Sequence, residues 1–364
     1  MAAPVTRLVE ALEREHLPFC QWKGAAALER ALRGERDLDW LVRASDWQRA
    51  LRVIEAAGWK RALPRRGDEE QGIAHFFAFE PALDPLLHLH LHDRVLSGED
   101  WINSHALPLG EDFLTSRRRA HGVPVPDAAG EAALLVLKHA IRWGSLPDRV
   151  TSWLRPTREA EESAALLEEP TLSAAAALVH ARCPALDAAT FRACAAALGS
   201  GGGGLLPVLA PLAARAARRR LRLARRVRRA LRPWSRQRGV ERPLAYLRVL
   251  QARLRRLLDG ERRERAPAAG ALLIALSAPD PAHARRAAAE LAAWLGQVFA
   301  VRTLEAGQAD ERSLSKAAAA REIVLCLGAP PPLRTLGSMR SACVSVPARE
   351  ASPGALRAAV WNAL

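Results

Sequence analysis

Hydrophobic positions in the first third of the chain follow two different periods. Apolar residues recur every three or four positions in TRLVEALEREH (6–16) and DWQRALRVIEAAGW (46–59), which predicts two amphipathic helices. They recur at every second position in RDLDWLV (36–42) and LLHLHLHDRVL (86–96), which predicts two strands. Helices and strands that alternate in this way predict a mixed α/β core.

The pattern changes after this core. Apolar spacing becomes almost wholly helical, as in GEAALLVLKHAIRWG (130–144), and GSGGGG (199–204) then predicts a flexible break. An arginine-rich amphipathic segment and a last α/β pattern follow. We therefore predict an α/β protein with four parts: a core at 1–125, a helical extension at 126–198, the glycine break and an arginine-rich linker helix at 199–240, and a smaller α/β domain at 241–364.

The net charge of +15 is concentrated in one segment. Twelve arginines and no acidic residue lie between Arg215 and Arg238, which accounts for most of the excess. One interpretation is a linker helix with a solvated arginine face, and the other is a weak contact with an anionic membrane or RNA. Because no aromatic-rich strand or helix-turn-helix pattern accompanies the arginines, specific DNA binding is not expected.

The remaining composition favours a cytoplasmic location. The N-terminal segment MAAPVTRLVEALERE carries acidic residues and does not resemble a signal peptide, and no apolar run is long enough to span a bilayer. No pair of cysteines forms a CxxC motif, which argues against a disulfide framework or a zinc ribbon. The five cysteines are Cys20, Cys183, Cys194, Cys326 and Cys343.

Two carboxylates in RDLDWLV are the strongest candidates for chemistry. Asp37 and Asp39 are two residues apart, so an extended strand places them on one face. Such a pair holds divalent ions that bridge the phosphates of a nucleoside triphosphate. Gly24 and Ala25 precede them at a predicted helix start, where backbone amides bind phosphate. The alternative is a solvated strand edge, because DxD patterns are common by chance.

The order of Gly-small turn, helix, DxD strand and helix ending in AAGW resembles the DNA polymerase β-like nucleotidyltransferase superfamily. More narrowly, KG followed by RDLDWLV is similar to a bacterial nucleotidyltransferase family, over about residues 1–165. The resemblance implies Mg²⁺-dependent transfer of a nucleoside monophosphate from a nucleoside triphosphate to an acceptor hydroxyl, which remains to be identified. It also implies a link to cell-surface polysaccharide production. The implied site comprises Asp37 and Asp39 as catalytic metal ligands and Lys23, Gly24 and Ala25 as nucleotide-binding residues.

One position departs from the family pattern. Members carry a third catalytic acid on a later strand, and the matching residue here is His90. An imidazole accepts protons but is a poor Mg²⁺ ligand. Alternation places His88, His90 and His92 on one strand face, which allows Mn²⁺ or Zn²⁺ instead; the alternative is a polar face over a vestigial cleft. No functional role is predicted for His16, His75, His105, His121 and His180.

A second resemblance covers the last domain. GALLIAL (270–276) and LSAPDPAHARRAAAELAAWLG (276–296) predict a strand, a turn and a helix, and are similar to thymidylate kinase-like proteins, which many bacteria fuse behind this type of nucleotidyltransferase. The phosphate-loop residues of that family are replaced, so we predict an inactive pseudokinase. The replacements are Ala278, Pro281, His283, Ala284 and Arg285.

Two functions remain open from the sequence. The intact Gly24–Asp39 unit favours a nucleotidyltransferase. The histidine at position 90 and the altered phosphate loop favour a catalytically decayed protein that acts by binding or as a scaffold.

Overall fold

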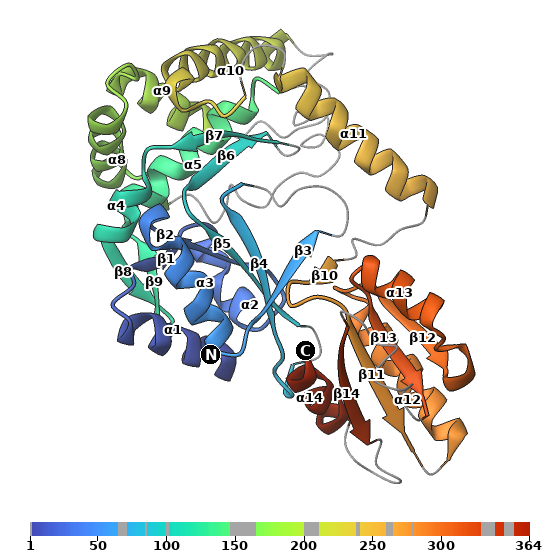
Figure 1. Ribbon diagram of the computed structural model, residues 1–364. Coiled ribbons are helices and arrows are strands. Elements are labelled where there is room, and N and C mark those ends of the chain that lie inside the picture. Colours follow the sequence, from blue (N-terminus) through green and yellow to red (C-terminus); the bar gives the residue numbers. More distant parts are fainter. Residues whose placement is uncertain are drawn as a thin grey trace.

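A computed structural model gives the fold of the chain (Figure 1). It describes residues 2–64, 71–83, 86–99, 102–145, 165–199, 211–237, 241–259, 265–278, 280–328, 339–345 and 353–364. Helices and strands form one mixed sheet of six strands and one parallel sheet of four strands, with two short two-stranded ribbons. The predicted α/β fold class is therefore confirmed.

The six-stranded sheet has the order β1-β2-β5-β4-β3-β10. Its strands are β1 (Phe19–Gln21), β2 (Leu38–Val42), β3 (Lys60–Pro64), β4 (Ile73–Ala78), β5 (Leu87–His92) and β10 (Arg265–Pro267). β2 and β5 are parallel, whereas every other pair of neighbours is antiparallel. β10 follows the helical parts of the chain, so residues far apart in sequence complete one sheet.

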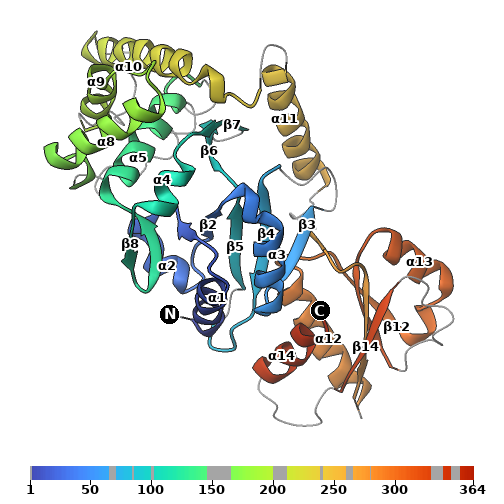
Figure 2. The same ribbon diagram turned by 60° about the vertical axis from the view of Figure 1, so that its left-hand side comes forward.

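Alternation divides this sheet into an apolar and a polar face. Leu38, Trp40 and Val42 of β2 are buried with apolar residues of three helices, α1 (Ala3–Arg14), α2 (Leu28–Leu32) and α3 (Trp47–Ala56). Figure 2 shows α1 and α3 in front of the strands. The residues between these positions face the other way, where Asp39 and the β5 histidines lie and where Leu41 packs into the core that contains residues 113–114 and 132–141.

The predicted strand 86–96 is divided in two. β5 ends at His92, and β6 (Val95–Glu99) pairs with β7 (Ile102–Leu107) in a separate ribbon. The break falls at a bend at Asp93 and Arg94, where the Asp93 amide donates to the Gly72 carbonyl and the Arg94 guanidinium binds the Asp93 carboxylate. Asp93 stands where the period of two would place an apolar residue, so the sequence carried a signal of this break.

The helical extension packs against the end of this sheet. Its helices are α4 (Gly110–Thr115), α5 (Ala128–Arg142), α8 (Glu169–Arg182), α9 (Ala188–Gly199) and α10 (Pro211–Ala230), and a ribbon of β8 (Arg117–Ala120) and β9 (Val123–Pro126) lies beside α4 and α5. Among the described residues, no helix is both long and apolar enough to cross a bilayer. The predicted glycine break lies, from residue 200 onward, outside the described residues.

The arginine-rich helix α10 is part of this extension. Leu223, Val227 and Leu231 are buried in the core that α5, α8 and α9 share. Arg220 donates to the Ala197 carbonyl, and Arg228 donates to the Ile141 carbonyl. The buried apolar residues of α10 are therefore not accessible to a partner, whereas the exposed arginines are. Contact of these arginines with RNA or an anionic membrane stays a prediction. Those arginines are Arg218, Arg219, Arg222, Arg225, Arg226, Arg229 and Arg232.

The four-stranded parallel sheet forms the C-terminal unit. Its order is β12-β13-β11-β14, with β11 (Leu272–Ser277), β12 (Val301–Glu305), β13 (Ile323–Leu327) and β14 (Arg340–Ser345). Helices α12 (Pro281–Leu295) and α14 (Pro353–Ala363) pack on one face, and α13 (Glu311–Ala319) packs on the other. The strand and the helix predicted at 270–296 are confirmed as β11 and α12, and residue 279 of the predicted turn lies outside the described residues.

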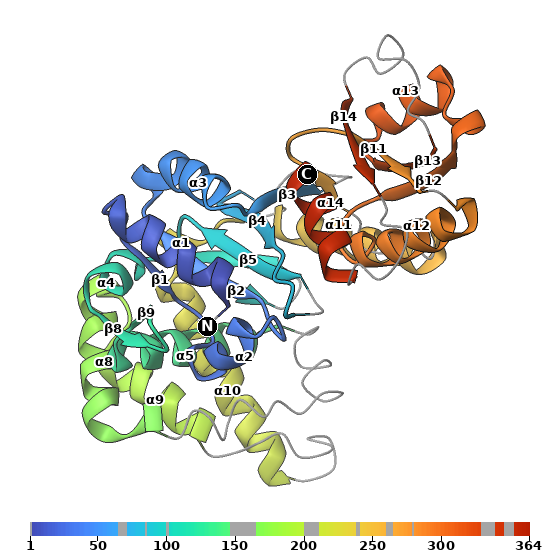
Figure 3. The ribbon, with the colours of Figure 1, turned by 90° about the horizontal axis from the view of Figure 1, so that it is seen from below.

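The two sheets meet through aromatic side chains. Phe79, just after β4, contacts Trp294 of α12, and Phe77 contacts Phe299. The helix α11 (Glu241–Asp259) precedes β10, so the chain returns to the first sheet before it enters the second. Figure 3 shows the C-terminal unit at the opposite end of the molecule from α8, α9 and α10.

Candidate functional site

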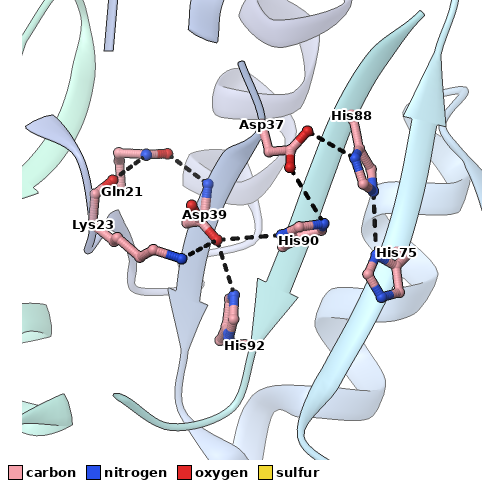
Figure 4. A network of polar contacts seen from close by, with 8 residues as sticks. All are labelled: Gln21, Lys23, Asp37, Asp39, His75, His88, His90 and His92. Atoms are coloured by element: carbon pink, nitrogen blue, oxygen red, sulfur yellow. Dashed lines mark hydrogen bonds and ion pairs between the residues drawn. The ribbon is translucent and has the colours of Figure 1, made fainter. Parts of the chain in front are cut away.

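Strand pairing assembles a polar row across three strands of the six-stranded sheet. Asp39 of β2 lies beside His90 of β5, and His90 lies opposite His75 of β4. Paired residues point to the same face of a sheet, so the three side chains converge. His88 and His92 lie two residues to either side of His90 and extend the row along β5 (Figure 4).

Asp39 is the most enclosed acidic group of this row. Its Oδ1 atom lies 3.3 Å from His90 Nδ1, 3.3 Å from His92 Nε2 and 3.5 Å from Lys23 Nζ. Burial raises the pKa of a carboxyl group, but the two histidine hydrogen bonds and the lysine charge outweigh it and hold the pKa of Asp39 well below its usual value. Asp39 is therefore an anion at neutral pH.

Asp37 lies immediately before β2, and half of its side chain is exposed to solvent (50%). Its Oδ1 atom is 2.9 Å from His88 Nδ1, and its Oδ2 atom is 3.8 Å from His90 Nε2. Burial opposes ionisation, yet the contact with His88 lowers the pKa of Asp37. The two aspartates therefore flank the His90 ring from one side of the sheet, as the spacing of two predicts.

Gln21 connects the carboxylates to the Lys23-Gly24 turn. Its amide oxygen accepts a hydrogen bond of 3.0 Å from the Asp39 backbone N–H, and its amide nitrogen donates to the Lys23 carbonyl at 2.5 Å. The residue is 1% exposed. Sequence analysis missed this role, although one polar residue in the buried segment LPFCQW was a signal that it serves a buried contact.

The Gly24 turn is open. Gly24 has φ of +72°, which favours glycine, and a side chain there would meet nothing within 4 Å. A short 3₁₀ helix, Ala25–Ala27, starts here and leads into α2, and within the described residues no side chain caps its first amides. Lys23 and Gly24 are exposed. The Ala27 amide donates to the Gly24 carbonyl, so the amides of Ala25 and Ala26 are the ones suited to bind an anion at this exposed helix start.

His75 is the residue that sequence analysis set aside and the structure brings into the network. Its Nδ1 atom is 3.2 Å from His88 Nε2, and its ring lies edge-on to that of His90 at 4.6 Å. Burial lowers the pKa of His75, and burial likewise lowers the pKa values of His88 and His92. Alternation in IAHFFA (73–78) shows which residues share a face, but only the pairing of β4 with β5 places His75 here.

The donor atoms of this face fit two kinds of metal ion. Mg²⁺ takes oxygen ligands and is usually held by one or two carboxylates together with substrate phosphates. Asp37 and Asp39 supply the two carboxylates. β5 brings histidines and no carboxylate to this face, so the oxygen set has no third carboxylate there. Four imidazoles surround the aspartates instead, and imidazole suits zinc and related first-row ions. Two triples bring their donor atoms within 4.8 Å of one another: His75, His88 and His90; and Asp39, His90 and His92.

The kinase-like loop has a different geometry. Asp280 accepts hydrogen bonds from the amides of Ala282 (2.9 Å) and His283 (3.2 Å), so a carboxylate already caps α12. Arg285 of α12 forms an ion pair with Glu305 at 2.9 Å. The amides that a phosphate would need are occupied by an internal anion. The assignment of this domain as a pseudokinase stays a prediction.

We expect Asp280→Ala to destabilise the C-terminal unit without creating a nucleotide site. Loss of a helix N-cap costs about 1 kcal/mol. In the variant, Pro281 still has no amide N–H and Ala284 still has no side-chain charge to offer a phosphate. Urea unfolding of the full chain measures the first effect, and titration with ATP and Mg²⁺ measures the second. Glu290→Ala, at an exposed position of the same helix, is the matched control. ATP binding gained by Asp280→Ala would contradict the expectation.

Comparisons with family models, curated proteins and solved structures gave no match to this chain. Inferences about its function therefore depend on the arrangement of these residues.

Proposed function

We propose that the N-terminal α/β core is a nucleotidyltransferase, which transfers a nucleoside monophosphate from a nucleoside triphosphate to an acceptor hydroxyl. One observation carries the proposal: Asp37 and Asp39 share a sheet face next to an open glycine turn, and Gln21 ties that turn to the backbone of Asp39. A carboxylate pair fixed beside a phosphate-binding turn is what this reaction needs.

Each residue has a role that its position supports. The amides after Gly24 bind triphosphate oxygens, and the Lys23 ammonium adds positive charge beside them. Asp37 and Asp39 would hold Mg²⁺. When bound, this ion neutralises charge on the leaving pyrophosphate and lowers the pKa of the acceptor hydroxyl. His90 contacts both carboxylates through its two ring nitrogens and so orients them, in the place where the related family has its third acid.

Incubation of the purified full-length chain with each of the four labelled triphosphates, Mg²⁺ or Mn²⁺, and a cell extract tests the proposal. We expect label to be transferred to one acceptor, and we expect Asp37→Asn to abolish the transfer. Asp46→Asn is the matched control, because the Asp46 side chain makes no capping hydrogen bond at the start of α3. Identification of the labelled product also tests whether the acceptor is a precursor of cell-surface polysaccharide.

A non-catalytic binding or scaffold protein is the alternative. Asp39 Oδ1 already has three partners, Lys23, His90 and His92, which satisfy the carboxylate without any metal ion. This observation favours the non-catalytic alternative. This alternative predicts that no triphosphate binds with divalent ion dependence and that no label is transferred. Calorimetric titration with ATP, GTP, CTP and UTP separates the two functions before an acceptor is known.

A further inference from the structure

Three imidazoles from two neighbouring strands form a compact group on the polar face of the sheet. His75 comes from β4, and His88 and His90 come from β5. The ring centroids of His88 and His90 are 4.2 Å apart, and the His75 ring lies 4.6 Å from His90 and 5.4 Å from His88. One nitrogen of each ring lies within 4.8 Å of the others. Figure 4 shows these rings side by side across the two strands.

The contact between Asp37 and His88 fixes which nitrogen of His88 is available. A carboxylate only accepts hydrogen bonds, so His88 Nδ1, 2.9 Å from Asp37 Oδ1, carries the proton. In the neutral ring this leaves a lone pair on Nε2, 3.2 Å from His75 Nδ1, and an ion bound by both nitrogens would displace any proton that they share. A carboxylate that orients a histidine for metal binding is the usual outer partner of a ligand histidine.

One distance within the group matches that between two ligands of one ion, and the remaining donor atoms lie within 4.8 Å of one another. Nitrogen ligands 2.0–2.1 Å from a tetrahedral zinc ion are separated from one another by about 3.3–3.4 Å. The His75 Nδ1 and His88 Nε2 atoms are 3.2 Å apart. All three histidines are half-buried, so an ion can reach them from solvent and keep a further coordination position open. Histidines on a single strand are too widely spaced to supply three ligands to one tetrahedral ion. His75 of the adjacent strand β4 supplies the third ligand.

The neighbouring triple of Asp39, His90 and His92 is less suited to hold such an ion. His92 is 4% exposed, and its Nδ1 atom has no hydrogen-bond partner within the described residues. It therefore lacks the outer partner that orients a ligand histidine. The geometry favours the His75 group.

We propose that His75, His88 and His90 form a binding site for Zn²⁺ or a related first-row metal ion, with Asp37 as the orienting carboxylate. Three histidines and an open position are the donor set of a catalytic zinc site, in which the open position takes water or an anionic oxygen. The site goes beyond the proposed nucleotidyl transfer and does not depend on it, because its ligands bind the ion without a nucleotide.

Metal titration of the full-length chain, made metal-free with a chelator and containing no nucleotide, tests this site. We expect about one Zn²⁺ to bind per chain, and Co²⁺ to give the intense visible absorption of a four-coordinate nitrogen site. A thiolate charge-transfer band would instead place the ion on cysteine. Mg²⁺ in excess should not displace the bound Co²⁺, because imidazole is a poor Mg²⁺ ligand.

Variants decide which residues hold the ion. We expect His75→Ala to weaken Zn²⁺ binding by more than about 100-fold, since removal even of an outer partner costs 10–100-fold. His75→Gln, which keeps more of the side-chain volume, should give the same loss if the alanine variant folds poorly. His180→Ala, at an exposed position of α8, is the control and should bind as the wild type does. Absence of stoichiometric binding by the wild type, or wild-type affinity in a folded His75 variant, would overturn the proposal.

Discussion

Replacement of Asp39 by asparagine is expected to reduce nucleotidyl transfer about 10³-fold, because a metal-ligating carboxylate contributes several kcal/mol of charge stabilisation in the transition state. The amide has almost the same shape, so packing around β2 is retained while the negative charge is lost. Lys23, His90 and His92 then keep an oxygen acceptor but lose their anionic partner. The fall should therefore appear in the rate of transfer more than in the folded structure.

The same variant changes acid stability in a defined direction. Because the pKa of Asp39 is lower in the folded chain than in the unfolded chain, the ionised carboxylate stabilises the fold at pH values above its ordinary pKa. That contribution disappears as the pH falls toward the lowered value. Asp39→Asn cannot titrate, so its unfolding free energy should depend less on pH in the acidic range than that of the wild type.

The rate of transfer of labelled nucleotide measures the first effect. Urea unfolding at a series of pH values from about 3 to about 7, a range that brackets carboxyl titration, measures the second. Asp46→Asn, which also removes one carboxylate near β2, should leave the transfer rate unchanged. If Asp39→Asn transfers label as fast as the wild type does, Asp39 holds no catalytic ion and the proposed reaction is wrong.

Two substitutions separate the proposed reaction from the proposed metal site. Asp39 supplies no donor atom to the group formed by His75, His88 and His90 but contacts His90, so Asp39→Asn should slow transfer about 10³-fold and weaken Zn²⁺ binding less than His75→Ala does. His75→Ala should remove Zn²⁺ binding in the absence of any nucleotide. A chain that binds Zn²⁺ but transfers no label supports the metal site alone, and the reverse result supports the transferase alone.

Local rules in the sequence account for much of the polar face. The spacing of Asp37 and Asp39 and the alternation of His88, His90 and His92 follow from the period of two in any strand, so their faces could be predicted without knowledge of the fold. The capped start of α12 was also readable, because Asp280 followed by Pro281 is a typical N-cap and first helical position. A carboxylate at that cap competes with phosphate for the same amides.

Long-range pairing accounts for what the sequence could not supply. His75 joins the site only because β4 lies antiparallel to β5 with His75 opposite His90. β10 completes the sheet by pairing with β3, although about two hundred residues separate them in the chain. Strand register depends on which apolar faces meet in the folded chain, and a single strand pattern does not state its partner.

Truncation of Trp40 is expected to have the largest effect on stability. The Trp40 side chain is fully buried, and its ring centroid lies 4.8 Å from that of Phe19. In the sequence of β2, Trp40 stands between Asp39 and Leu41. A Trp→Ala change in a core costs about 3–5 kcal/mol, which is a large fraction of the stability of a domain. Because Trp40 anchors the strand that carries Asp39, transfer and Zn²⁺ binding should be lost together as the core unfolds.

Two further variants test whether the burial of the Trp40 ring causes the expected loss of stability. Trp47→Ala removes the same ring from a half-buried position on α3 and should cost less. Trp40→Phe keeps an aromatic ring and deletes an indole N–H that has no hydrogen-bond partner within the described part of the chain, so it should cost less than Trp40→Ala. Urea unfolding followed by circular dichroism measures all three. Equal losses for Trp40→Ala and Trp47→Ala would mean that β2 does not form the centre of this core.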